Sequence, residues 1–235
     1  MKAWLIAWRE IRWEVFLDRA SLLRTGIFVL LPLFLVLANG GIGRGAGGDA
    51  ALLGIAVQCV IFPAFSGVAL IAATFTAEKE NGTLVPLLAA PIRDLDIVVG
   101  KLGGMVITVM AASLVTLGAG YVIAAYRYGL ARVAEVFTPE LIYALLVLAF
   151  LYLITTGSIT MIVAARVRSS RAAQQLAGLV IAFSAALFGG LGFIASQLGE
   201  GWPLLGLGVA LVLFDVLALE LARRAWQRGE VIARV

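Results

Sequence analysis

The stretch that decides the fold is AALLGIAVQCVIFPAFSGVALIAATFTA, residues 50–77, which contains no Asp, Glu, Lys or Arg. A helix needs roughly 20 predominantly apolar residues to cross the core of a bilayer, and this run is longer. Uncharged runs of similar length occupy residues 25–43, 102–126, 141–165 and 172–199, and a sixth apolar run, 203–221, has Asp215 in its interior. With 62% hydrophobic and 14% charged residues, the chain is predicted to be an all-α integral membrane protein with six transmembrane helices.

Basic residues are distributed unevenly among the segments that connect these runs. Fifteen of the 18 lysines and arginines fall in the N-terminal segment, the second and fourth loops and the C-terminal tail. The opposite side has Arg44, Arg127 and Arg132 only. Because basic residues concentrate on the cytoplasmic side, we expect a multi-pass protein of a prokaryotic inner membrane with both termini in the cytoplasm. The net charge of +4 then reflects topology, and no nucleic-acid partner is predicted.

The N-terminal segment, residues 1–21, is too charged to cross a membrane. On a helical wheel its apolar residues form one stripe and its acids another: Trp4, Trp8, Ile11 and Val15 against Glu10, Glu14 and Asp18. This pattern predicts an amphipathic helix in the membrane interface, and the alternative is a solvated extension of the first span. Residues 22–222 are then the transmembrane domain, and residues 223–235 are a cytoplasmic tail.

Residues that could perform chemistry are few. The chain has no His and one Cys, so no metal site is predicted, and no nucleotide-binding motif occurs. Asp215 is the one acid predicted well inside a span, where a charge costs roughly 2.5–3.5 kcal/mol on insertion scales. It either bonds a neighbouring helix or lines a translocation path. The polar stretch TTGSIT, residues 155–160, is its expected partner, and the candidate path residues are Thr155, Thr156, Ser158 and Asp215.

The most charged connector is TFTAEKENGTLVPLLAAPIRDLDIVVGK, residues 74–101, which contains the loop assigned to 75–100. We expect the second span to end near Phe75 and Asn81-Gly82 to form a turn. Thr83 can cap a short helix that ends at Pro91, and Asp94 can cap the helix of the third span. The apolar face of the short helix, Leu84, Leu87 and Leu88, either rests on lipid or binds a soluble partner.

A resemblance favours the second alternative. The pattern formed by Glu78, Glu80, Gly82, Thr83, Leu84, Leu87, Leu88, Pro91, Gly100 and Lys101 resembles the coupling region of the type-2 permease family of ATP-binding-cassette (ABC) transporters. The stretch from Gly157 to Phe183 resembles the second cytoplasmic crossing of the same family. The resemblance implies a cytoplasmic coupling helix between spans 2 and 3.

The resemblance also implies partners and site residues. It implies a membrane subunit that pairs with a second copy or a close sibling and is driven by a separate cytosolic ATPase, which holds ATP and Mg. The implied ATPase interface is Glu78, Glu80, Gly82, Thr83, Leu84, Leu87, Leu88, Pro91 and Arg93. No predicted span has a ring of charge, so the expected cargo is hydrophobic, amphipathic or peptide-like, and export is the expected direction.

Other readings are a haem-exporter-type permease of cytochrome c maturation, a structural membrane protein that does not transport, and an intramembrane enzyme. The resemblance to a permease makes the chain itself a non-enzyme, because the ATP hydrolysis would belong to the partner.

Overall fold

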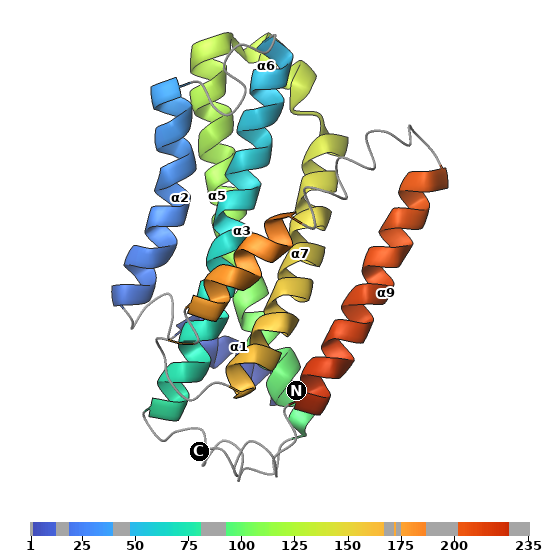
Figure 1. The fold of residues 1–235 in the computed structure, drawn as a ribbon. Helices are drawn as coiled ribbons and strands as arrows, with labels where there is room; N and C mark the ends of the chain where they lie inside the picture. Colours follow the sequence, from blue (N-terminus) through green and yellow to red (C-terminus); the bar gives the residue numbers. More distant parts are fainter. Residues whose placement is uncertain are drawn as a thin grey trace. The chain divides into compact units, whose positions relative to one another are not determined.

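The computed structural model describes residues 2–12, 19–39, 48–80, 93–166, 172, 175–186 and 202–225. All regular secondary structure in these ranges is helical, which confirms the all-α prediction (Figure 1). The helices are α1 (Lys2–Arg12), α2 (Arg19–Asn39), α3 (Gly48–Glu80), α5 (Asp94–Tyr128), α6 (Leu130–Val136), α7 (Pro139–Arg166) and α9 (Trp202–Ala225). A further apolar helical segment covers Gln175–Ala186.

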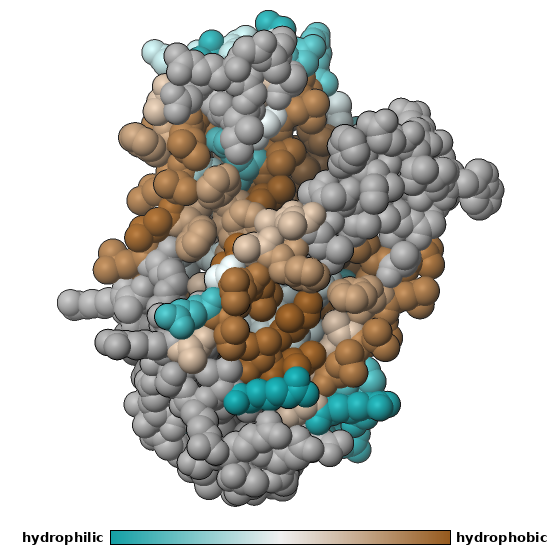
Figure 2. Space-filling model, viewed as in Figure 1, coloured by the Kyte–Doolittle hydropathy of each residue, from teal (hydrophilic) through white to brown (hydrophobic). Residues whose placement is uncertain are grey.

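Three described helices are long and apolar enough to cross a membrane, over Ala51–Thr74 of α3, Leu95–Tyr128 of α5 and Pro139–Ala164 of α7. The apolar parts Thr25–Ala38 of α2 and Gln175–Ala186 are shorter. Large apolar side chains cover much of the visible surface (Figure 2), and Phe34 and Val122 are each 65% exposed. Exposed apolar surface on this scale suits lipid rather than water. The chain is therefore membrane-embedded, and a total of six spans stays a prediction.

The helices form two compact units by their contacts. Unit 1 contains Met1–Glu10, Val68–Met105 and Leu151–Val235, and unit 2 contains Ile11–Gly67 and Val106–Phe150. Helices α3, α5 and α7 each contribute one part to unit 1 and the other part to unit 2. The two units are described separately below.

Unit 2 has an apolar core with a few internal polar bonds. Buried side chains such as Val36 of α2 and Ile55 of α3 pack with parts of α5 and α7. A Cβ on Gly120 of α5 would lie 2.5 Å from the Cys59 Sγ, so the close contact of α5 with α3 depends on a residue without a side chain. The buried Gln58 Nε2 donates a hydrogen bond to the Pro32 carbonyl at 3.1 Å, which satisfies its amide within the core.

Two of the three arginines predicted for the non-cytoplasmic side stabilise helix ends in unit 2. The Arg127 guanidinium donates to the carbonyls of Val36 and Leu37, both at 2.9 Å, near the C-terminus of α2. Arg132 pairs with Asp49, in the first turn of α3, at 3.2 Å. A cation at a helix C-terminus and an acid at an N-terminus both complement the helix dipole. The short helix α6 lies between α5 and α7 along the chain.

Unit 1 places the candidate site residues. A small apolar cluster joins Val68 and Ala72 of α3 to Ala177 and Val180 of the Gln175–Ala186 segment. Helix α9 has a buried stripe of Asp215, Ala218 and Ala222 at spacings of three and four residues. A Cβ on Gly157 of α7 would lie 2.7 Å from Leu102 Cδ2 and 2.9 Å from Met105 Cε, which shows how closely α7 and α5 pack there.

Candidate functional site

Four charged side chains of unit 1, which we call the charged cluster, join three helices. They are Arg9 and Glu10 of α1, Glu78 of α3 and Lys101 of α5. The Lys101 Nζ lies 3.0 Å from Glu10 Oε1 and 2.9 Å from Glu78 Oε2. The Arg9 Nη2 lies 2.9 Å from Glu10 Oε1 and 2.7 Å from Glu78 Oε1. Two cations and two carboxylates thus alternate in a closed ring, in which each acid contacts both bases.

The close contact of α1 with α5 explains how the cluster forms. A Cβ on Gly100 would lie 2.7 Å from the Ile6 Cβ and 2.8 Å from the Ala3 backbone oxygen, and a Cβ on Gly104 would lie 3.0 Å from the Glu10 Cβ. Glycines four residues apart lie on one face of a helix and let a second backbone approach closely. The lysine between them therefore reaches the acid of α1 away from solvent.

The cluster is buried to different depths around its ring. The side chain of Lys101 is 2% exposed, whereas that of Arg9 is 52% exposed. Burial raises the pKa of Glu10, but the charges of Lys101 and Arg9 outweigh burial and hold this pKa below its ordinary value. A buried ammonium is tolerated when oppositely charged groups surround it. The ion pairs of the charged cluster hold α1, α3 and α5 together.

The position of Glu10 corrects the sequence analysis. The helical wheel set Glu10 on the polar stripe of an interfacial helix, but Glu10 is only 7% exposed and faces the protein beside Ile6 and Ala7. A helical wheel shows only the periodicity of α1 itself. It cannot show that Lys101 of α5 pairs with Glu10. Trp4 and Trp8 are both more than half exposed, with ring centroids 6.4 Å apart, which is compatible with the interfacial placement that the sequence predicts.

The predicted coupling residues lie around a segment that is only partly described. Glu78 lies in the charged cluster, Glu80 is the last residue of α3, and Arg93 is exposed directly before α5. The Arg93 carbonyl accepts bonds from the amides of Asp96 and Ile97, at 2.9 and 3.3 Å, so the cap position is one residue earlier than the predicted Asp94. The remaining predicted interface residues lie outside the described residues: Gly82, Thr83, Leu84, Leu87, Leu88 and Pro91.

The candidate path residues form a second buried group in unit 1. Thr155 Oγ1 of α7 donates a hydrogen bond to Asp215 Oδ1 of α9, so the expected pairing of the acid with the TTGSIT stretch is confirmed. Thr156 instead bonds the Tyr152 carbonyl of its own helix at 2.6 Å. Within the described part of the chain, the Ser158 Oγ and the Asp215 Oδ2 are buried without a hydrogen-bond partner. A role for these residues in translocation stays a prediction.

Neighbouring hydroxyls extend this polar group. The Tyr152 hydroxyl and Ser184 Oγ, of the Gln175–Ala186 segment, lie 3.0 Å apart and are both buried. Thr160 Oγ1 donates to the Thr156 carbonyl at 2.7 Å. Hydroxyls that bond the carbonyl four residues earlier satisfy themselves within one helix. The Thr155 and Tyr152 hydroxyls connect α7 to other helical segments of the described structure.

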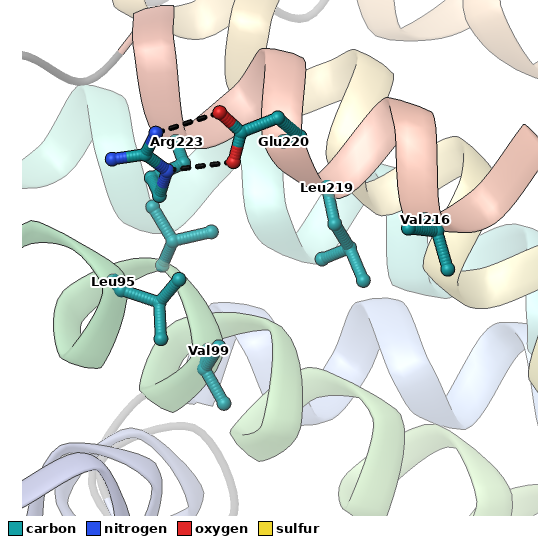
Figure 3. A pocket seen from close by; sticks show the side chains of 7 residues that line it. Leu95, Val99, Val216, Leu219, Glu220 and Arg223 are labelled. Atoms are coloured by element: carbon teal, nitrogen blue, oxygen red, sulfur yellow. Dashed lines mark hydrogen bonds and ion pairs between the residues drawn. The ribbon is translucent and has the colours of Figure 1, made fainter.

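A groove of about 210 Å³ lies between the start of α5 and the end of α9, both in unit 1. Figure 3 shows Leu95 and Val99 of α5 facing Leu219 of α9, with the Glu220 and Arg223 side chains at one end. Two contacts of 2.6 and 2.7 Å join Arg223 to the carboxylate of Glu220. The walls of the groove are apolar and its end is polar.

Comparison with known families identifies the chain's relatives. A family model described as "ABC-2 family transporter protein" matches residues 47–209, which is more than half of the chain. The matched range includes Glu78, Lys101 and Thr155, and it ends before Asp215. No curated protein matches the sequence significantly.

Proposed function

The chain belongs to the ABC-2 transporter family and is a membrane permease component of an ABC transporter, and from this premise we propose that it exports its substrate with energy from a separate cytosolic ATPase. ATP and Mg belong to that ATPase, since the chain has no nucleotide-binding motif of its own. The permease pairs with a second copy of itself or a close sibling, and the path opens alternately to the two sides of the inner membrane.

The observation that carries this proposal is the charged cluster at both ends of the coupling segment. Residues 81–93 connect Glu80, the end of α3, to Asp94, the start of α5. Glu78 lies two residues before the end of α3, and Lys101 lies in the second turn of α5. The Lys101 Nζ lies 2.9 Å from the Glu78 Oε2. A segment whose two ends are clamped together passes force to both helices at once. This suits a lever that couples a soluble motor to transmembrane helices.

The apolar residues of the segment are the proposed contact with the motor. Leu84, Leu87 and Leu88 occur at spacings that place them on one face of a short helix. Each leucine contributes about 1.5–3 kcal/mol when it is fully removed from water. Loss of two of them therefore removes several kcal/mol of association free energy, while the charged cluster that supports the segment is retained.

The substrate proposed is hydrophobic, amphipathic or peptide-like. The buried polar groups of α7 and α9 are hydroxyls and one acid, Asp215, rather than a set of charged groups for a hydrated ion. The apolar groove between α5 and α9 is compatible with such a substrate. Cytoplasmic termini follow from the distribution of basic residues.

The test is the double substitution Leu87→Ser with Leu88→Ser in the permease expressed together with its ATPase. We expect the permease to reach the membrane in normal amount, to lose co-purification of the ATPase, and to lose substrate-stimulated ATP hydrolysis. The matched control is Leu23→Ser, because Leu23 of α2 is 70% exposed and lies outside the coupling segment. Normal ATPase binding and normal coupled hydrolysis in the double variant would refute the role of these leucines.

A further inference from the structure

Asp215 is a buried acid that forms no ion pair with any described residue. It is 4% exposed in the centre of α9, and Thr155 donates a hydrogen bond to one of its carboxyl oxygens. The other oxygen, Oδ2, is buried and has no hydrogen-bond partner among the residues that the structure describes. Among the described residues no ion pair includes Asp215, because the lysine and arginines of unit 1 that form ion pairs do so with Glu10, Glu78 and Glu220.

The described group that contacts Asp215, the Thr155 hydroxyl, is neutral. The buried polar side chains of this part of α7 are all hydroxyls, those of Tyr152, Thr155, Thr156, Ser158 and Thr160. The nearest charged residues along α9 are Glu220 and Arg223, which are five and eight positions away, or roughly 7.5 and 12 Å along the axis, and they bond each other. A hydroxyl stabilises a carboxylate far less than a cation does. The negative charge therefore has no compensation within the described structure.

An ionised carboxylate in this setting has to be neutralised. An uncompensated charge in a low-dielectric interior costs so much free energy that the group binds a proton or a cation instead. Metal cations such as Ca²⁺ require six or more oxygen ligands, and the described contacts of Asp215 bring only the hydroxyl of Thr155 to the carboxyl group. A proton needs no additional ligand and fits the unpartnered Oδ2.

We propose that Asp215 is a proton-binding site, loaded when α7 and α9 are packed as described. In this state Oδ2 carries the proton and Oδ1 accepts the bond from Thr155. The proton leaves to water when water reaches the carboxyl group, which leaves a carboxylate that disfavours return to the dry arrangement. Ser158 lies one turn from Thr155 on the same side of α7, and its buried unpartnered hydroxyl is a neutral acceptor near the site. Opening and closing of this part of unit 1 is thereby linked to pH.

The direct test is reaction with dicyclohexylcarbodiimide, which modifies protonated carboxyl groups in apolar surroundings. The full-length protein in lipid nanodiscs is treated from about pH 5.5 to about pH 9, a range that begins above the ordinary pKa of an aspartate, and modification is located by peptide mass spectrometry. We expect Asp215 to be modified at neutral pH, with modification falling as the pH rises. Glu10 and Glu78, which are ion-paired, are the internal controls and are expected to stay unmodified.

A second measurement tests the proposal in the case that dicyclohexylcarbodiimide does not reach Asp215. Infrared spectroscopy of the same nanodiscs detects the C=O stretch of a protonated carboxyl group, and we expect a band that is lost in Asp215→Asn. Thr155→Val removes a donor that favours the charged form, so modification and band are expected to persist to higher pH. Absence of both signals overturns the proposal. Protection of Asp215 by sodium ions, in comparison with choline at one pH, also overturns it and identifies a cation site instead.

Discussion

Removal of the buried ammonium of Lys101 is the most severe single change to the charged cluster. In Lys101→Met an apolar chain of similar length replaces the lysine, so packing changes little while two ion pairs are lost. The carboxylates of Glu10 and Glu78, which are 9% and 14% exposed, are left with Arg9 as their charged partner in the cluster. Because Arg9 is half exposed, it neutralises them less effectively than the buried lysine does.

The expected magnitude follows from burial. Loss of one partner from a buried ion pair costs about 3–5 kcal/mol, whereas an exposed pair contributes about 0–1 kcal/mol. We take the lower figure of about 3 kcal/mol for Lys101→Met because Arg9 still contacts both acids. At roughly 2–4 °C per kcal/mol for a chain of this size, the unfolding temperature falls by about 6–12 °C. The matched control, Arg9→Met, removes an exposed cation from the same two acids and is expected to lower it by about 4 °C or less.

The assay is thermal unfolding of purified protein, followed by the intrinsic fluorescence of its five tryptophans. The double variant Lys101→Met with Glu10→Gln should recover part of the loss, because it removes one of the two uncompensated carboxylates. The ATPase complex of Lys101→Met should also hydrolyse ATP with weaker response to substrate. Equal effects of Lys101→Met and Arg9→Met would refute the reasoning, since the buried cation would then be no more important than the exposed one.

Three further predictions concern topology, packing and pH. A cysteine introduced at Arg132 in a cysteine-free background should react with an impermeant thiol reagent added to whole cells, and one at Lys79 should not; external labelling at Lys79 contradicts the orientation. Gly100→Ala should destabilise the protein by about 1–3 kcal/mol because its Cβ would lie 2.8 Å from a backbone oxygen of α1, whereas Gly103→Ala, with open space around it, should not; equal unfolding temperatures contradict this packing. Since the pKa of Glu10 is lowered by folding, its contribution to stability is present above its unfolded pKa and is lost as the pH falls through its folded pKa; unfolding temperatures measured in acid should fall less in Glu10→Gln than in the native chain, and parallel curves oppose this.

The apolar runs of the sequence located the three described helices that are long enough to cross a membrane, because long hydrophobic segments have few alternatives to a helix in lipid. The run at residues 141–165 corresponds to α7, Pro139–Arg166, within two residues at each end. The run at 102–126 became α5, which begins eight residues earlier at Asp94. These first residues of α5 include the buried Lys101. Hydrophobicity alone does not predict that they belong to the helix. Helical structure therefore continues beyond the apolar core where charged residues have partners.

Some contacts between distant residues could be predicted from the sequence and others could not. The bond of Thr155 to Asp215 could be predicted because an acid inside a span requires a hydrogen-bond donor. The hydroxyls of residues 155–160, in the fourth predicted span, were the clearest candidates for that donor. The charged cluster could not be predicted, because Glu10 lies 91 positions from Lys101 in the sequence. In addition, a charged helix at the N-terminus is expected to be exposed to solvent. The pair Gly100 and Gly104 was the available signal, because it predicts a close helix neighbour without identifying which helix.

Contacts within unit 1 connect the charged cluster to the proton-binding acid through few steps. Lys101, held by the cluster, precedes Leu102, whose side chain packs against Gly157 of α7. Gly157 follows Thr155 by two positions, and Thr155 bonds Asp215. Under the proposed coupling, force on residues 81–93 would shift the start of α5 and with it the surface on which α7 packs. Helix α7 carries Thr155, the donor that favours the charged form of the acid. If both proposals hold, the same movement that opens the path also changes the affinity of Asp215 for its proton, and by linkage the pH of the membrane surroundings changes the response of the permease to its ATPase.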